Sequence, residues 1–285
     1  MDSVIVTGSG TGLGRETSLH LAGRGFAVYA TVLNDEQARS LEAAARERKV
    51  SGLRVLPMDI TDRASIESAT ETVLRETGGI YGLVNNAGIG LRGFFEDLAE
   101  PEIRRLFDTN VFGTMAVTRT VLPHMRAAGR GRIVMVTSIG GRIGSLAVST
   151  YCATKFAQEG FGESLYQELL PLGIRVVLIE PAIVNTERWG IHRGVARGAQ
   201  DPASPYHRWF QREEALASRI SAAAPTQSAD VARAIHRALA ARRPKLRYMV
   251  GKRARLVFLM RRYLPEPLFD RVYFGGIVRY VTRSS

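Results

Sequence analysis

Short apolar runs alternate with longer amphipathic stretches over about the first 180 residues, and this alternation restricts the possible folds more than any other feature of the chain. The apolar runs lie at 3–7, 26–32, 53–57, 80–84, 132–137 and 174–179, and helical patterns occupy 13–24, 35–49, 61–77, about 100–128 and 149–170. Apolar runs separated by helices are typical of parallel strands that are buried on both faces. The sequence therefore predicts an α/β fold, with a doubly wound, mostly parallel sheet and helices on both of its faces.

The alternation ends at about 187–225, where glycine, proline and tryptophan residues surround a helical stretch near 206–222. This segment, called the insertion below, is too long for a simple connection, and such segments usually act as lids or binding loops. A helix is predicted at 228–242, and a basic C-terminal extension follows at about 244–285. We predict that residues 1–285 form one domain with a lid and a helical extension.

A glycine-rich loop follows the first predicted strand, and Thr7–Gly14 has the pattern T-G-x-x-x-G-x-G. Glycines allow a tight turn and let backbone N–H groups approach a diphosphate, while the next helix directs its positive N-terminus at the phosphates. The spacing is neither G-x-G-x-x-G nor the ATP-binding pattern that ends in Gly-Lys-Ser/Thr. A plain strand-to-helix turn would have the same composition, but the place between the first strand and the first helix favours a nucleotide site.

A second pattern combines Ser138, Tyr151 and Lys155. A tyrosine normally titrates near pH ~10, so it is a poor acid-base catalyst at neutral pH. A lysine four residues later lies one turn away on the same helix face, and its positive charge favours the phenolate. The Ser138 hydroxyl would hold a substrate oxygen against the phenol. Because helices often carry a Tyr-x-x-x-Lys pair by chance, the surrounding motifs must decide.

Those motifs resemble one known family. Six segments stand in the order found in short-chain dehydrogenase/reductases: Thr7–Gly14, Asn85–Gly88, Asn110, Ser138, Tyr151–Lys155 and Pro181 with Thr186. The resemblance covers about residues 3–240, and it is closest to the hydroxysteroid and retinol dehydrogenase branch at Tyr29–Thr31, Ser138–Gly141, Tyr151–Phe156 and Arg261–Asp270. It implies a Rossmann-like fold with a seven-stranded sheet.

The resemblance also implies a nicotinamide dinucleotide, NAD or NADP. Gly8, Gly12 and Gly14 would surround the pyrophosphate, Asp59 and Ile60 would meet the adenine, and Thr186 would hold the carboxamide. The other implied cofactor residues are Thr11, Leu13, Asn86, Ala87, Gly88, Tyr151, Lys155, Pro181 and Val184. Judged from the residues alone, Asp59 is equally suited to capping the helix near Thr61, and Asn85–Asn86 to forming a turn.

The end of the second predicted strand bears on the choice of dinucleotide. An acid there would bind the ribose 2′-hydroxyl, and an arginine would favour a 2′-phosphate. The positions hold Val32 and Leu33 instead, and Thr11 stands where NADP-preferring relatives often have a basic residue. Arg15 and Arg39 are candidates to serve a phosphate. Since a well-placed arginine is missing, we favour NAD.

The catalytic residues that the resemblance implies are Asn110, Ser138, Tyr151 and Lys155. Tyr151 would act as general acid and base between a secondary alcohol and a ketone, Ser138 would bind the reacting oxygen, and Lys155 would lower the pKa of the tyrosine. Asn110 would steady a water that leads to Lys155, although a helix-kink or capping role is an alternative.

The expected substrate wall is apolar. Its residues are Ser138, Ile139, Gly140, Ile143, Leu146, Val148 and Tyr151 on one side, Ala182 and Ile183 on the other, and Trp189 in the insertion. These side chains predict a lipophilic substrate, whether steroid-like, retinoid-like or a long-chain carbonyl compound. The alternatives to an enzyme are a nucleotide-binding scaffold without turnover and a membrane-surface interaction protein.

Most of the positive charge lies in the C-terminal extension. Residues 242–285 contain twelve Lys or Arg and two acids, a net charge of +10, whereas the whole chain carries +12. Basic helices with aromatic residues often lie on anionic membranes, so we weigh peripheral membrane contact against packing on the insertion or on another subunit. No nucleic-acid partner is expected, because no recognised motif accompanies the charge.

The remaining expectations concern compartment and assembly. Cys152 is the single cysteine, which excludes an intramolecular disulfide and suits a cytoplasmic protein, as does the absence of a predicted signal peptide. The histidines lack metal-ligand spacing, so no metal site is predicted. By resemblance, the helices at 100–128 and 149–170 would form the faces of a homodimer or homotetramer.

Overall fold

The computed structural model describes residues 1–185 and 193–283. The strands are β1 (Ser3–Val6), β2 (Ala27–Val32), β3 (Leu53–Pro57), β4 (Gly82–Asn85), β5 (Gly90–Arg92), β6 (Gly131–Val136), β7 (Ile174–Pro181), β8 (Val184–Asn185), β9 (Arg193–Val195), β10 (Thr226–Gln227) and β11 (Arg247–Val250). The α-helices are α1 (Gly12–Ala22), α2 (Asp35–Glu47), α3 (Arg63–Thr77), α4 (Glu100–Phe107), α5 (Thr114–Ala127), α6 (Ser149–Leu169), α7 (His207–Ala222), α8 (Ser228–Ala240), α9 (Lys252–Tyr263), α10 (Glu266–Phe269) and α11 (Gly275–Thr282).

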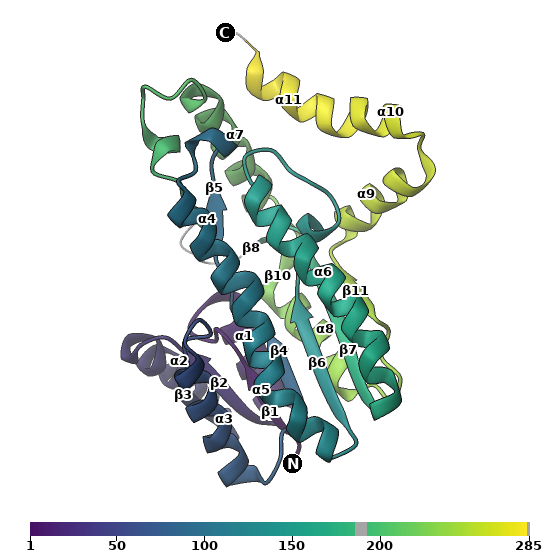
Figure 1. The fold of residues 1–285 in the computed structure, drawn as a ribbon. Coiled ribbons are helices and arrows are strands. Elements are labelled where there is room, and N and C mark those ends of the chain that lie inside the picture. Colours follow the sequence, from purple (N-terminus) through teal and green to yellow (C-terminus); the bar gives the residue numbers. More distant parts are fainter. Residues whose placement is uncertain (186–192, 284–285) are drawn as a thin grey trace.

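Seven strands form one parallel sheet in the order β11-β7-β6-β4-β1-β2-β3 (Figure 1). The predicted fold class is therefore confirmed. The chain reverses direction across the sheet between β1 and β4, which is where open α/β sheets bind ligands at the carboxyl ends of their strands. The seventh strand, β11, lies inside the range predicted as a helical extension, so the helical part begins only after residue 250.

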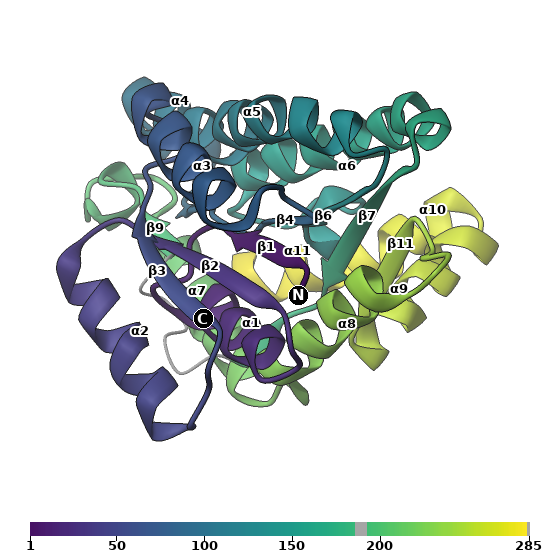
Figure 2. The same cartoon turned by 90° about the horizontal axis from the view of Figure 1, so that it is seen from below.

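Alternate strand residues supply the two halves of the core. Val4 and Val6 pack with α1, α2 and α8, whereas Ile5 packs with α3, α5 and α6 on the opposite face. Figure 2 shows the sheet between these two helical layers. This period of two places apolar side chains on both faces, which explains why the strands read as continuous apolar runs.

The predicted helix at 100–128 is continuous but contains an irregular turn. A π-helical turn, Asp108–Gly113, separates α4 from α5 and contains the fully buried Asn110. Such turns shift the regular pairing by one residue and are frequent at functional sites. The kink considered for Asn110 in the sequence is thus a π-helical turn.

The insertion and the extension both fold against the body. In the insertion, β9 pairs with β5, and Phe210 of α7 is buried in an apolar cluster with Leu91, Leu106 and Ala199. In the extension, α11 lies against α7, where Arg212 donates to the Val281 carbonyl at 3.3 Å (Figure 1). Within the described ranges, no helix is both long and apolar enough to cross a membrane.

Candidate active site

Four neighbouring strands, β7, β6, β4 and β1, end at the same edge of the sheet, and the loops that follow them carry most of the predicted site residues. The first of these loops is Thr7–Gly14. Gly8 and Gly12 have φ values of 66° and 52°, which favour glycine. A Cβ on Gly14 would lie 2.2 Å from the Gly8 carbonyl oxygen. The start of α1 can therefore approach the loop this closely only because residue 14 is a glycine.

The loop after β4 is bonded to the glycine loop. Asn86 Nδ2 donates to the carbonyls of Thr7 and Gly8 at 2.9 and 3.1 Å, and the Asn86 and Ala87 N–H groups donate to Thr7 Oγ1 at 3.0 Å each. The Asn86 side chain therefore holds the shape of the glycine loop. Gly88 lies beside Asn110, because a Cβ there would be 3.1 Å from Asn110 Oδ1.

Asp59 and Ile60 follow β3 and lead into α3. Asp59 Oδ1 accepts hydrogen bonds from Thr61 N at 2.8 Å and Thr61 Oγ1 at 2.7 Å, while Asp62 caps the helix by accepting from Ala64 N. Ile60 is buried, and a Cβ on Gly113 would lie 2.9 Å from it. The carboxylate thus holds the turn before the helix, close to the capping role that the sequence left open.

Two polar residues that the sequence analysis did not single out, Asn34 and Gln37, follow β2 at the start of α2. Asn34 caps α2 by accepting from Gln37 N, and Gln37 Oε1 accepts from Leu33 N at 3.1 Å. The Gln37 amide lies directly under the glycine loop, since a Cβ on Gly10 would be 2.4 Å from its Oε1. Arg15 is turned toward α2, where it donates to Ser40.

Ser138 and Tyr151 meet at Gly140. Ser138 begins a short 3-10 turn, Ile139–Gly141, and its Oγ accepts from Gly140 N at 3.0 Å. A Cβ on Gly140 would lie 3.4 Å from Ser138 Oγ, 3.4 Å from Cys152 Sγ and 3.7 Å from Tyr151 Cε1. The hydroxyl, the phenol ring and the thiol therefore all lie next to Gly140.

Lys155 lies one turn after Tyr151 and is 6% exposed. Its Nζ is 5.7 Å from the centroid of the Tyr151 ring and donates to the Val136 carbonyl at 3.1 Å and to Gln158 Oε1 at 2.9 Å. Burial lowers the pKa of Lys155 to about 8, and the nearby Glu159 carboxylate opposes this shift. The structure thus places Ser138 and Tyr151 beside Gly140, with Lys155 one turn further along α6.

Asn110 joins the same group through α6. Its Nδ2 donates to the Ile89 carbonyl at 2.9 Å and to Thr154 Oγ1 at 3.1 Å, and its Oδ1 accepts from Ile89 N at 2.8 Å. Its own carbonyl accepts from Gln158 Nε2 at 2.6 Å. The connection from Asn110 to Lys155 therefore passes through the Gln158 amide, a residue that the sequence analysis missed.

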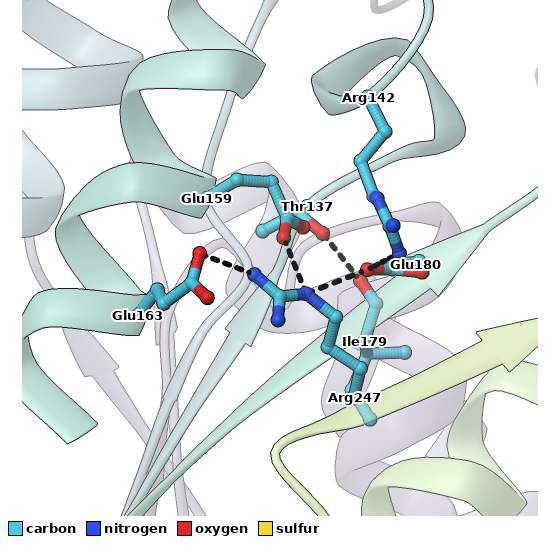
Figure 3. Close-up of polar contacts among 7 residues, drawn as sticks. All are labelled: Thr137, Arg142, Glu159, Glu163, Ile179, Glu180 and Arg247. Atoms are coloured by element: carbon cyan, nitrogen blue, oxygen red, sulfur yellow. Dashed lines mark hydrogen bonds and ion pairs between the residues drawn. The ribbon is translucent and has the colours of Figure 1, made fainter. Parts of the chain in front are cut away.

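A cluster of charges surrounds Arg247 and includes Glu159, one turn after Lys155 on α6 (Figure 3). Arg247 of β11 pairs with Glu159 at 3.2 Å, Glu163 at 3.0 Å and Glu180 at 3.2 Å, and Arg142 also pairs with Glu180 at 3.3 Å. Burial raises the pKa of Glu180, which is 1% exposed, and the Glu159 charge adds to that effect. The seventh strand thus supplies the cation that the two buried carboxylates share, and Arg142 is a second partner of Glu180.

A family model described as short chain dehydrogenase matches residues 2–193. The chain belongs to the short-chain dehydrogenase family. Membership confirms the predicted class, an oxidoreductase of the alcohol dehydrogenase type, and it supports a nicotinamide dinucleotide as the cofactor.

Relatives of this short-chain dehydrogenase match it over most of its length and most of their own. An uncharacterized oxidoreductase of Bacillus subtilis is 37% identical over 94% of this chain and 95% of its own. Retinol dehydrogenase 5 of Homo sapiens is 32% identical, covering 94% and 86%, and 17-beta-hydroxysteroid dehydrogenase type 1 of Homo sapiens is 35% identical, covering 93% and 81%. These matches confirm the predicted similarity to the hydroxysteroid and retinol dehydrogenase branch.

Solved structures agree with the fold. A short-chain dehydrogenase from Streptomyces avermitilis superposes with a TM-score of 0.80 at 30% identity, covering 98% of this chain and 99% of that one. A variant of actinorhodin polyketide ketoreductase, solved with NADPH, has a TM-score of 0.71 at 29% identity and covers 84% and 90%.

The predicted substrate wall of this short-chain dehydrogenase is only partly assembled around Tyr151. Leu146 and Tyr151 pack on the apolar cluster that contains Leu91, Leu106 and Phe210. Ile143 and Val148 are buried, Ile139 and Ile183 are half-buried, and Ala182 is turned to the extension, since a Cβ on Gly251 would lie 2.6 Å from its Cβ. Pro181 and Val184 are buried at the end of β7 and in β8, whereas Thr186 and Trp189 lie outside the described residues.

The extension reaches the site at a residue that sequence reasoning did not find. Tyr273 lies in the π-helical turn Asp270–Phe274 and makes a hydrogen bond with Ser145. Burial raises the pKa of Tyr273, and the neighbouring Cys152 adds to the shift. The sequence around Tyr273 gives no indication of a partner as distant as Ser145, so only the tertiary structure reveals this contact.

Proposed function

We propose that this short-chain dehydrogenase interconverts a secondary alcohol and a ketone on a lipophilic molecule, with a nicotinamide dinucleotide as the redox partner. The observation that carries the proposal is the convergence on Gly140 of the Ser138 hydroxyl and the Tyr151 ring, with the buried Lys155 ammonium one turn below. A scaffold without turnover would not need a lysine at 6% exposure beside a tyrosine, because burying an ammonium is unfavourable.

The glycine loop fits the diphosphate of a dinucleotide. The loop lies in close contact with the start of α1 at Gly14, and the α1 N-terminus favours negative charge there. Gly8, Thr11, Gly12, Leu13 and Gly14 would hold the diphosphate end. The residues proposed for the remaining parts are Asp59, Ile60, Asn86, Ala87 and Gly88 at the adenosine side and Pro181, Val184, Thr186 and Lys155 at the nicotinamide side. When bound, the nicotinamide accepts or donates the hydride.

The protein residues would manage the proton and the reacting oxygen. In the oxidation direction, the Tyr151 phenolate takes the hydroxyl proton, and in reduction the phenol returns it. Ser138 donates a hydrogen bond to the oxygen as its charge develops. The Lys155 ammonium favours the phenolate electrostatically. Because burial lowers the pKa of Lys155 to about 8, this support fades as the pH rises through that value.

A lipophilic substrate is favoured by the surroundings of Tyr151. The ring packs on the cluster around Leu91, Leu146 and Phe210, so a substrate that reaches the phenol would pass apolar side chains. Two relatives bear names that refer to retinol and to a hydroxysteroid. We therefore propose a steroid-like or retinoid-like alcohol, or a long-chain carbonyl compound.

The decisive experiment is a screen of lipophilic alcohols and ketones with NAD and NADP, followed at the nicotinamide absorbance. Tyr151→Phe should lower turnover by about 10²-fold or more while the dinucleotide Kd stays within about twofold. Tyr166→Phe on the same helix is the matched control and should keep wild-type turnover. Near-normal turnover by Tyr151→Phe would sink the acid-base role, and binding of dinucleotide without turnover of any compound would favour a scaffold.

We further propose a preference for NAD. The first position after β2 is Leu33, which is 64% exposed, and Arg15 donates to Ser40. A 2′-phosphate near β2 would then depend on Arg39, an exposed residue of α2, for a cation partner. The ratio of kcat/KM values for the two dinucleotides tests this, and a ratio that favours NADP would contradict it.

Membrane contact by the extension is a second proposal with its own observation. Leu256, Leu259 and Tyr263 of α9 are 60%, 53% and 72% exposed at positions that share one helix face. Arginines flank them, which suits an anionic bilayer. Co-sedimentation with phosphatidylserine vesicles should fall when Leu256 and Leu259 are replaced by Asp, whereas Phe95→Asp, at an exposed apolar residue outside the extension, should leave it unchanged. Equal sedimentation of all three proteins would discard the idea.

A further inference from the structure

A buried glutamine connects the Lys155 ammonium with the main chain at Asn110. Gln158 is 3% exposed. Its Oε1 accepts from Lys155 Nζ at 2.9 Å, and its Nε2 donates to the Asn110 carbonyl at 2.6 Å and to Thr114 Oγ1 at 3.1 Å. Both donor hydrogens and one acceptor site of the amide are thus used inside the site.

The partners fix the orientation of this amide. An ammonium only donates and a carbonyl only accepts, so exchanging Oε1 and Nε2 would place donor against donor and acceptor against acceptor. The Asn110 carbonyl belongs to the π-helical turn Asp108–Gly113, in which the regular helical pairing is displaced. The turn and the glutamine therefore complement each other.

We propose that Gln158 is a positioning residue of the reaction: its amide ties the Lys155 ammonium to the π-helical turn at Asn110 and so holds this cation below Tyr151. The proposal rests on the proposed function, because the position of the cation matters to turnover only if Tyr151 exchanges protons with a substrate. Within the described residues, the Lys155 ammonium donates to the Val136 carbonyl and to this amide.

Other charges surround Lys155 but are engaged elsewhere. Glu159 on α6 raises the pKa of Lys155 through space, but its carboxylate pairs with Arg247 of β11 (Figure 3). Glu180 of β7 pairs with Arg247 and with Arg142 of the loop after β6. The Gln158 amide is therefore the polar side chain that bonds directly to the ammonium and also reaches the Asn110 turn.

Two substitutions at this position should act in opposite directions on Lys155. Gln158→Met keeps the length of the side chain but removes the acceptor, so the charged form of Lys155 loses a hydrogen bond and should titrate at lower pH. Gln158→Glu places a negative charge at the same distance, so the ammonium should persist to higher pH. A role in packing alone would not produce shifts of opposite sign.

The titration can be followed without any substrate. The sequence contains four lysines, Lys49, Lys155, Lys245 and Lys252, so the side-chain signals of 13C-lysine-labelled protein are few enough to assign. We expect the wild-type Lys155 midpoint near its pKa of about 8. The midpoint should fall by about one pH unit in Gln158→Met, as one charge-assisted hydrogen bond would produce, and rise in Gln158→Glu. Gln167→Met, at an exposed glutamine of the same helix, should leave it unchanged.

Turnover supplies the second readout. In Gln158→Met, kcat should fall by about tenfold or more, and the alkaline limb of its pH profile should move to lower pH, with KM for the dinucleotide changed less than kcat. Unchanged midpoints, or midpoints that move in the same direction in both variants, would overturn the proposal. If Gln158→Met does not fold, a midpoint in Gln158→Glu that stays or falls overturns it equally. Opposite shifts in a protein that turns over no alcohol would instead refute the proposed function and leave the tie between Gln158 and Lys155 standing.

Discussion

Replacing Gly14 by alanine should damage the glycine loop far more than the same change at Gly12. A Cβ on Gly14 would lie 2.2 Å from the Gly8 carbonyl oxygen and 2.5 Å from Asn86 Nδ2, closer than van der Waals contact allows. Gly12 offers the opposite case, because no atom of the described structure lies within 4 Å of a Cβ there and only its φ of 52° opposes alanine. The pair separates steric closure of the loop from backbone strain.

The structure sets the size of the two effects. At Gly14, Asn86 would lose its hydrogen bonds to the Thr7 and Gly8 carbonyls, worth about 1 kcal/mol each. Forced displacement of the backbone adds about 1–3 kcal/mol, so the free energy of unfolding should fall by roughly 3–5 kcal/mol. At Gly12, an alanine in the left-handed conformation costs about 1–2 kcal/mol. The lower conformational entropy of the unfolded alanine variant offsets about half of that cost.

Equilibrium unfolding in urea measures both variants, provided that the slope with denaturant stays constant. The Kd for the dinucleotide, titrated on the same proteins, should rise by about a hundredfold or more in Gly14→Ala and less than tenfold in Gly12→Ala, since the fold-change follows the lost free energy of the loop. Equal losses of stability in the two variants would contradict this prediction, because the clash at Gly14 would then cost no more than the backbone strain at Gly12.

Further expectations concern the charge cluster and the assembly. Arg247→Met leaves Glu159 and Glu180 without their shared cation and should destabilise the fold by about 3–5 kcal/mol. Burial already raises the pKa of Glu180 above its ordinary value, so protonation of this carboxylate at lower pH relieves the destabilisation. The urea midpoints of variant and wild type should therefore converge as the pH falls from 7.5 toward 5 and diverge as it rises. A constant difference between the midpoints would contradict this. We also propose a homodimer or homotetramer through the α4–α6 face, where Phe112 and Phe156 are 60% and 45% exposed. Phe112→Glu should therefore lower the mass found by light scattering, and an unchanged mass would argue against this face.

Much of the fold was predictable because the apolar pattern of most strands agrees with their burial on both faces of the sheet. The runs at 3–7 and 132–137 are apolar on both faces, and the structure buries Ile5 and Val6 on opposite sides of the sheet. The strand β11 gave no such signal, because Arg247–Val250 is a short edge strand within a basic stretch. Its pairing with β7 arises from tertiary contacts, which composition does not encode.

The site was predictable where spacing alone brings residues together. Tyr151 and Lys155 share a helix face, so their proximity follows from helical geometry. Gln158 was missed because a glutamine three residues after Lys155 is equally at home on a solvated surface, and its partners come from the distant π-helical turn. Asp59 shows the converse problem, since the same carboxylate suits a ligand contact and a turn, and its bonds to Thr61 favour the turn.

The place of β11 has a consequence for the newly synthesised chain. Because β11 comes after residue 246 in sequence but completes the sheet beside β7, the emerging protein presents β7 as an open edge until nearly nine-tenths of the chain has left the ribosome. Open strand edges invite pairing with other chains. Arg247 arrives in the same strand, so Glu159 gains its counter-charge only then, whereas Glu180 can already pair with Arg142. Closure of the edge and completion of the charge cluster therefore coincide late in folding.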